Sequence, residues 1–131
     1  MLLVEDDAKG RHILRTVLQG DGITVVGEAG HGRAGVELVE LHQPDVVLMD
    51  LRLPDMSGIE ATRLIKELDP LTQVIILTAY EGPLPERSAE QVGAYAYLVK
   101  GCSSELIREV ISQAWKYGAG IRMAARSGLT P

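Results

Sequence analysis

Acidic residues directly follow two of the most apolar short segments of this chain. Residues 2–4 run into the acidic triplet 5–7, and the apolar residues 46–49 run into Asp50. A carboxylate next to a buried segment needs hydrogen bonds, a cation or water, because otherwise it resists ionisation. Grouped carboxylates also repel one another unless a cation joins them, and their oxygen atoms suit a hard cation such as Mg²⁺. The two segments therefore predict a Mg²⁺ site if the fold brings their ends together.

Two further side chains have the chemistry to bind a phosphoryl group. Thr78 ends the apolar segment 73–78, and Lys100 follows the apolar segment 96–99. A hydroxyl group and an ammonium group can bind the oxygen atoms of a phosphoryl group while it is transferred. Together with the carboxylates and Mg²⁺, they predict phosphoryl transfer to an aspartate, with Asp50 as the nucleophile.

Each of these residues also has an ordinary structural explanation. Asp7 can cap a helix, Thr78 can be a plain strand residue, and Lys100 can be a solvated charge. The chemical interpretation therefore depends on whether the fold places all of them at one edge.

The chain alternates strand-like and helix-like segments, which predicts that placement. Short apolar or β-branched segments predict five strands, at residues 2–4, 23–29, 45–50, 73–78 and 96–99. Apolar residues at helical spacing predict five helices, at residues 8–19, 33–42, 57–69, 86–93 and 103–117. Nearly continuous apolar strands are typical of a parallel sheet with helices on both faces. We therefore predict an α/β fold with a doubly wound five-stranded parallel sheet, whose sites lie at the carboxyl ends of the strands.

Composition narrows the class of protein. The chain has 131 residues, which suits one domain with a core of its own. Its net charge of -5 argues against direct contact with nucleic acid. Its single cysteine, Cys102, cannot form an internal disulfide, and neither a membrane span nor a signal peptide is evident in the sequence. We expect a cytoplasmic protein that makes no contact with a membrane.

The chain resembles the receiver domain of two-component response regulators. The resemblance covers roughly residues 2–117 and is carried by the motifs LLVEDD, PDVVLMDLRLPDMSGIEA, VIILTAY and AYLVKG. It implies a flavodoxin-like fold with five helices and the strand order 2-1-3-4-5. It also implies that Asp50 is the phosphoacceptor, which receives its phosphoryl group from the phosphohistidine of a sensor histidine kinase.

The resemblance assigns a metal set around Asp50. It implies that Mg²⁺ is bound by Asp6 directly, by Glu5 largely through water, by Asp50 and by the backbone carbonyl of Arg52.

The resemblance also assigns a phosphoryl-binding pair and a switch. Thr78 and Lys100 correspond to the pair that binds the phosphoryl oxygens, and Tyr97 corresponds to the aromatic residue of the switch. We expect Thr78 to move toward the phosphoryl group and Tyr97 to follow it from an outward to an inward position.

One residue departs from the pattern of many receivers. Gly101 follows Lys100 where many receivers have a cis proline. A cis bond without proline costs about 2.5–4 kcal/mol, so the geometry of this peptide remains open at this point.

The remaining segments indicate a subfamily and its partners. The segments VVGEAGHGRAGVELV and YLVKG most resemble receivers with a LuxR-type helix-turn-helix output, and the final LTP resembles the start of such an output domain. We predict a receiver domain at 1–117 and a linker or tail at 118–131 that leads to an output domain outside this chain, with a stand-alone receiver as the alternative. Trp115 and Tyr117 make the last predicted helix a candidate surface for a phosphorylation-dependent homodimer.

An enzyme with an aspartate nucleophile and Mg²⁺ is the main functional alternative. Phosphatases of the haloacid-dehalogenase type place a second aspartate two residues after the nucleophile, where this chain has Arg52. A flavodoxin-like nucleotide binder would need a Gly-rich phosphate loop after the first strand, where this chain has EDDAKGRH. We therefore expect a signalling phosphoacceptor that controls an output, most simply transcription, and that assists its own phosphotransfer and dephosphorylation without being an enzyme.

Overall fold

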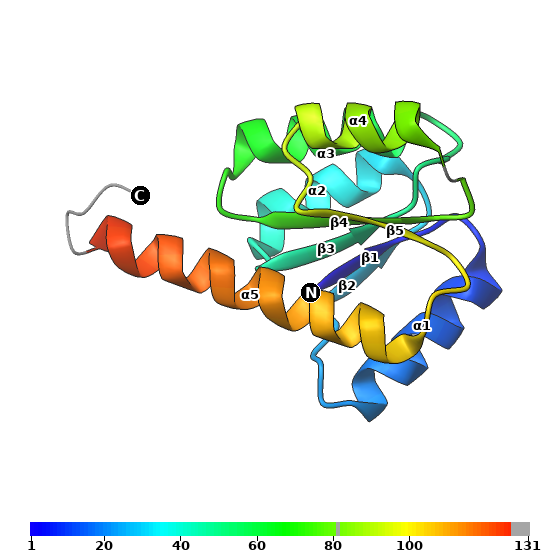
Figure 1. Cartoon of the computed structure of the whole chain (residues 1–131), viewed down its shortest axis with the longest axis horizontal. Helices are drawn as coiled ribbons and strands as arrows, with labels where there is room; N and C mark the ends of the chain where they lie inside the picture. The colour runs from blue at the N-terminus through cyan, green and yellow to red at the C-terminus, as the bar shows by residue number, and fades with distance from the viewer. Residues whose placement is uncertain (81, 127–131) are drawn as a thin grey trace.

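Five parallel strands form a single sheet in the order β2-β1-β3-β4-β5 (Figure 1). The computed structural model describes residues 1–80 and 82–126. Strands β1 (Leu2–Val4), β4 (Gln73–Thr78) and β5 (Ala96–Val99) have the predicted bounds, and β3 (Val46–Met49) is one residue shorter at each end than predicted. The predicted fold class and strand order are confirmed.

The second strand is much shorter than the sequence predicted. β2 spans only Gly27–Ala29, whereas residues 23–29 were expected to be extended throughout. β2 is an edge strand, and its three residues pair with the three residues of β1. β1 begins at Leu2, so the β-branched residues before Gly27 pair only with Met1: the Val26 amide donates to the Met1 carbonyl at 2.9 Å, and the Met1 amino group donates to the Thr24 carbonyl at 2.7 Å.

Helices cover both faces of the sheet, as the apolar strands predicted. In Figure 1, α1 (Ala8–Gly20) and α5 (Ser104–Arg126) lie on one face. The other face is covered by α2 (Gly32–His42), α3 (Gly58–Leu68) and α4 (Pro83–Gln91). Each face has its own apolar core: the α2–α4 side includes Val39, Ile65 and Ala89, and the α1–α5 side includes Leu18, Ile111 and Ala114.

Side-chain caps begin two of these helices at the residues that the sequence indicated. Asp7 caps α1 by accepting a hydrogen bond from the Lys9 amide at 3.2 Å. Ser57 caps α3 by accepting one from the Glu60 amide at 3.1 Å. The Glu60 carboxylate binds the Arg63 guanidinium on the exposed face of α3.

The last helix is longer than predicted. α5 continues to Arg126, whereas the apolar pattern indicated an end at residue 117. Its extra turns pack through a buried glycine, Gly118, and place the Arg122 guanidinium 3.7 Å from Asp45 and 3.9 Å from Asp69. Contacts made by glycine and arginine leave no apolar period in the sequence, which explains the error.

The predicted LTP motif lies outside the described residues. No described helix is long and apolar enough to span a membrane.

Candidate functional site

The carboxyl ends of β1 and β3 place two acidic side chains next to each other. The Glu5 amide donates to the Ala29 carbonyl at 3.0 Å, and the Asp50 amide donates to the Val4 carbonyl at 2.9 Å. These bonds continue the ladders of the sheet past the strand ends, so both residues are held by backbone. Glu5 is 5% exposed and Asp50 is 8% exposed.

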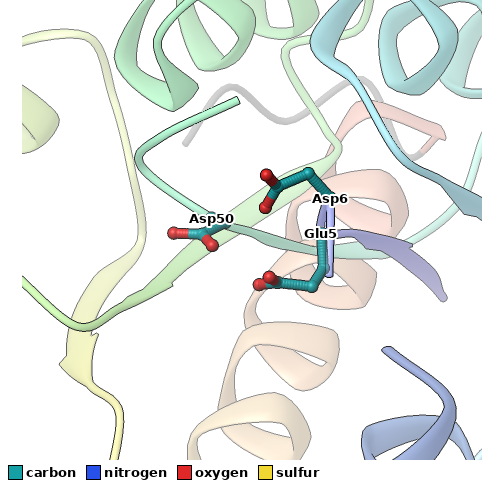
Figure 2. Close-up of side chains that lie close together, drawn as sticks. All are labelled: Glu5, Asp6 and Asp50. Carbon is teal, nitrogen blue, oxygen red and sulfur yellow. The ribbon is translucent and has the colours of Figure 1, made fainter. Parts of the chain in front are cut away.

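Asp6 completes a group of three carboxylates at this edge. Glu5, Asp6 and Asp50 each offer a carboxylate oxygen, and these atoms lie within 4.8 Å of one another (Figure 2). Oxygen ligands lie about 2.1 Å from Mg²⁺, so two ligands on opposite sides of the ion are about 4.2 Å apart. The three carboxylates are therefore close enough to hold a small hard cation once their side chains close around it, with water as the remaining ligands. Asp7, the third acid of the triplet, caps α1 instead.

Lys100 reaches the same group from the end of β5. Its Nζ lies 2.8 Å from Glu5 Oε2 and 3.1 Å from Asp50 Oδ2. Its backbone amide donates to the Thr78 carbonyl at 2.7 Å, which fixes the start of its side chain beside β4. One ammonium group thus bridges the two buried carboxyl groups.

Burial and neighbouring charges give the carboxyl groups of Glu5 and Asp50 different pKa values. Burial, together with contact with Asp50, raises the pKa of Glu5 to about 7. Burial also opposes the ionisation of Asp50, but hydrogen bonds with Glu5 and Lys100 outweigh it and lower the pKa of Asp50. Burial disfavours the charge of Lys100 as well, but the two carboxyl groups outweigh it and raise the pKa of Lys100. Asp50 is therefore the ionised member of the pair at neutral pH, which is the form that a nucleophile needs.

The two residues predicted to form the switch lie on neighbouring strands. Thr78 ends β4 and is fully buried, and Tyr97 lies on β5 with its ring packed against the core on the α2–α4 side. The Tyr80 amide donates to Thr78 Oγ1 at 3.4 Å, and the Tyr97 hydroxyl donates to the Tyr80 carbonyl. Tyr80 therefore links the two predicted switch residues in this structure.

A model of the response regulator receiver domain matches residues 1–112. The chain belongs to the response regulator receiver family. These are signalling domains of two-component systems, and the coarse functional prediction from the sequence is confirmed.

Relatives of this receiver include both longer regulators and a short protein. It is 45% identical over 111 residues to the transcriptional regulatory protein PdtaR of Mycobacterium tuberculosis, over 82% of this chain and 52% of PdtaR. It is 34% identical over 113 residues to the chemotaxis protein CheY of Bacillus subtilis, over 86% of this chain and 94% of CheY. A crystal structure of a LuxR-family two-component response regulator from Aurantimonas sp. is 32% identical with a TM-score of 0.79, over 86% of this chain and 82% of that one. The receiver thus spans about half the length of PdtaR.

Three residues near the acidic group were not singled out from the sequence. The Arg11 guanidinium donates to the Glu5 carbonyl at 2.5 Å and ion-pairs with Glu28 at 3.3 Å. Tyr80 joins Thr78 to Tyr97, and Gly58 approaches the Asp50 backbone closely. The sequence offered only weak signals for these three residues. Arg11 is an arginine in a polar helix, Tyr80 is an aromatic residue in the VIILTAY motif, and Gly58 is one of many glycines.

The peptide after Lys100 has no unusual bond. All peptide bonds in the described part of the receiver are trans, and Gly101 has a φ of 103°. Such a φ is accessible to glycine at little cost, so the turn after β5 is made by a flexible residue instead of a cis proline.

Glu5 makes the stability of the metal-free receiver depend on pH. Its pKa is about 7 in the folded state and about 4.5 in the unfolded chain. The folded state therefore holds a proton that the unfolded state releases, so this stabilisation is complete below the unfolded pKa and is lost as pH rises through the folded one. We expect the free energy of unfolding to fall by about 1–3 kcal/mol from about pH 5 to about pH 8 in a chelator.

Urea unfolding of Glu5→Gln and of Glu105→Gln, an exposed residue of α5, checks this expectation. The fall with pH should disappear only in Glu5→Gln, because the lowered pKa of the Met1 amino group acts in the opposite direction. The lowered pKa of Asp50 acts in a more acidic range and does not produce it. An equal slope in the wild type and in Glu5→Gln would contradict the assignment.

Proposed function

We propose that this receiver accepts a phosphoryl group on Asp50 from the phosphohistidine of a sensor histidine kinase and then changes conformation to control an output. The observation that carries the proposal is the position of Asp50: a buried carboxylate with a lowered pKa, between the Lys100 ammonium and an acidic pair. In the reaction an Asp50 oxygen forms a bond to phosphorus, the bond from phosphorus to the histidine nitrogen breaks, and the electron pair of that bond leaves with the imidazole.

Mg²⁺ would be held by the carboxylates of Glu5, Asp6 and Asp50 and by the backbone carbonyl of Arg52. Bound there, it would neutralise charge on the phosphoryl oxygens. The chain's own residues do the rest: Asp50 is the nucleophile, and Lys100 moves from the carboxylates to a phosphoryl oxygen. Thr78 donates its hydroxyl to another oxygen of the group.

Phosphoryl uptake by the wild-type receiver tests the proposal. Incubation with a small acyl phosphate and Mg²⁺ should increase the intact mass by one phosphoryl group, and a chelator should prevent the increase. Borohydride reduction followed by peptide mass spectrometry should locate the modification at Asp50. A phosphoryl group on any other residue would overturn the assignment.

Thr78→Ala is expected to separate uptake from signalling. A phosphoryl group adds about -1.5 to -2 charges at Asp50, and each charge-assisted hydrogen bond to it contributes roughly 1.5–3 kcal/mol. One such bond can shift a two-state equilibrium about ten- to a hundredfold, and Thr78→Ala removes it. We expect the variant to bind beryllofluoride at Asp50 more weakly and, once saturated, to show a Tyr97 ring response at least severalfold smaller than in the wild type.

Ring carbon chemical shifts of Tyr97, measured with and without beryllofluoride and Mg²⁺, supply the measurement. Thr78→Ser keeps the hydroxyl group and serves as the matched control, so it should respond as the wild type does. A full Tyr97 response in saturated Thr78→Ala would show that Thr78 does not carry the signal.

The proposed output is transcription through a LuxR-type domain that follows the linker or tail predicted at 118–131. The match to a LuxR-family regulator and the coverage of half of PdtaR support it, whereas coverage of 94% of CheY supports a stand-alone receiver.

The proposed partners are a sensor kinase and a second, phosphorylated copy contacting α5, where Trp115 is 51% exposed and Tyr117 is 55% exposed. Sedimentation should show dimers only with beryllofluoride; a tight dimer without it would exclude a phosphate-gated interface.

A further inference from the structure

Tyr80 is held at three points by residues from three separate segments. Its amide donates to Thr78 Oγ1, and its carbonyl accepts from the Tyr97 hydroxyl. Its ring lies under the Arg52 guanidinium, whose central carbon is 3.8 Å from the ring centroid. Tyr80 itself is 40% exposed, so its ring is accessible at the surface beside Arg52.

Arg52 lies on the same side of its loop as Asp50. Leu51 and Leu53 both pack against the core on the α2–α4 side, whereas Asp50 joins the acidic group and Arg52 is exposed above Tyr80. The backbone amide of Arg52 contributes to the lowered pKa of Asp50, so the backbone of Arg52 lies beside that carboxyl group. An extended arginine side chain is about as long as two residues of extended chain, about 6.6 Å. The Arg52 guanidinium can therefore reach a group attached to Asp50 without a change in the backbone.

We propose that the Arg52 guanidinium binds the phosphoryl group on Asp50 in the phosphorylated state: it leaves the Tyr80 ring, and Tyr80 then releases the Tyr97 hydroxyl. This inference rests on the proposed function of Asp50 and adds a second contact that responds to the phosphoryl group, beside Thr78. Both contacts act on Tyr80, one through its ring and the other through its amide.

The direction of the exchange follows from the strengths of the two contacts. An exposed guanidinium over a tyrosine ring is a weak interaction, because water competes for the cation. A phosphoryl group offers a guanidinium two parallel charge-assisted hydrogen bonds, which are much stronger. Lys100 gives up ion pairs with Glu5 and Asp50 when it moves to the phosphoryl group, whereas Arg52 has only to give up the ring. Phosphorylation therefore favours transfer of Arg52 from Tyr80 to Asp50.

Nuclear magnetic resonance of the full chain, with beryllofluoride and Mg²⁺ as the probe, tests the exchange. The Tyr80 ring current should shift the Arg52 side-chain protons upfield in the resting receiver. Saturation with beryllofluoride should remove that shift in the wild type and in Tyr80→Phe, which keeps the ring. Tyr80→Leu should lack the shift from the start.

The Tyr97 response tests the second half of the proposal. At equal occupancy, read from the fluorine signal of bound beryllofluoride, Arg52→Gln should show at least a twofold smaller Tyr97 ring shift than the wild type. Arg52→Lys keeps a cation without the planar fork, so it should recover part of the response.

Two results would overturn the inference while leaving the proposed function intact. One is an Arg52 signal that stays shifted upfield while the Thr78 amide responds to beryllofluoride. The other is a full Tyr97 response in Arg52→Gln. Absence of beryllofluoride binding and of phosphoryl uptake in the wild type would instead contradict the proposed function itself.

Discussion

Asp50→Asn is expected to abolish Mg²⁺-dependent phosphoryl uptake and, at the same time, to stabilise the metal-free fold. An amide has nearly the shape of the carboxylate but is not a nucleophile, so no acyl phosphate can form. Stabilisation follows from the charges, because Glu5 and Asp50 are both buried and share one ammonium group, that of Lys100. Without the second carboxylate, Glu5 can ionise beside Lys100, and the repulsion between the two acids disappears.

Two measurements check this prediction together. Intact mass after incubation with an acyl phosphate should show no gain in Asp50→Asn, and urea unfolding in a chelator at about pH 8 should show a gain of about 1–2 kcal/mol. Asp7→Asn is the matched control: Asp7 neighbours the acidic pair but serves as a cap, and asparagine caps helices equally well. The control should still take up the phosphoryl group. Uptake by Asp50→Asn, or its loss in Asp7→Asn, would contradict the site.

The sequence predicted the acidic group because the positions of its members depend mainly on strand order. Glu5, Asp50 and Lys100 each follow a short apolar strand, and parallel strands end at a common edge. A small error in a strand boundary does not alter this convergence. β3, for example, is one residue shorter at each end than expected, and Asp50 still lies next to Glu5.

Features that depend on contacts between distant segments were not predictable in the same way. The length of β2 depends on β1, and the extent of α5 depends on the fit of Gly118 against the Leu71 carbonyl. Neither contact leaves a periodic pattern in the sequence. The position of Tyr80 likewise depends on three segments that meet only in the folded sheet.

The pKa of Glu5 also depends on contacts between distant segments, so it was not predictable from the sequence. A glutamate next to an aspartate in sequence is ordinary, but burial beside Asp50 raises the pKa of Glu5 to about 7. Sequence alone indicates that charges gather at this edge, whereas the structure determines which carboxyl group holds a proton. The raised pKa of Glu5 and the lowered pKa of Asp50 leave Asp50 as the ionised member of the pair, which is the form that the proposed phosphoryl transfer needs.

Gly58→Ala is expected to destabilise the receiver by about 3 kcal/mol or more, because the added methyl group would collide with the backbone that carries Asp50. A Cβ atom at Gly58 would lie 2.0 Å from the Asp50 carbonyl oxygen and 3.0 Å from Leu51 Cα. The Gly58 amide also donates to the Leu51 carbonyl at 2.6 Å, so the first turn of α3 is bonded to this loop. The methyl group can be accommodated only if α3 and the loop move apart, which breaks that bond and displaces Asp50.

Thermal and urea unfolding measure the effect, and Gly120→Ala is the matched control. Gly120 lies within α5 with open space where a Cβ would be, so alanine there should stabilise the helix by about 0.5–1 kcal/mol. Gly58→Ala should instead lower the melting temperature by about 10 °C and slow phosphoryl uptake in the fraction that remains folded. The same substitution would then destabilise the receiver at Gly58 and stabilise it at Gly120. That contrast would show that the loss at Gly58 comes from the steric collision beside Asp50 and not from a general effect of replacing glycine in a helix. Stability of Gly58→Ala within about 0.5 kcal/mol of the wild type would mean that this close approach does not hold Asp50 in place.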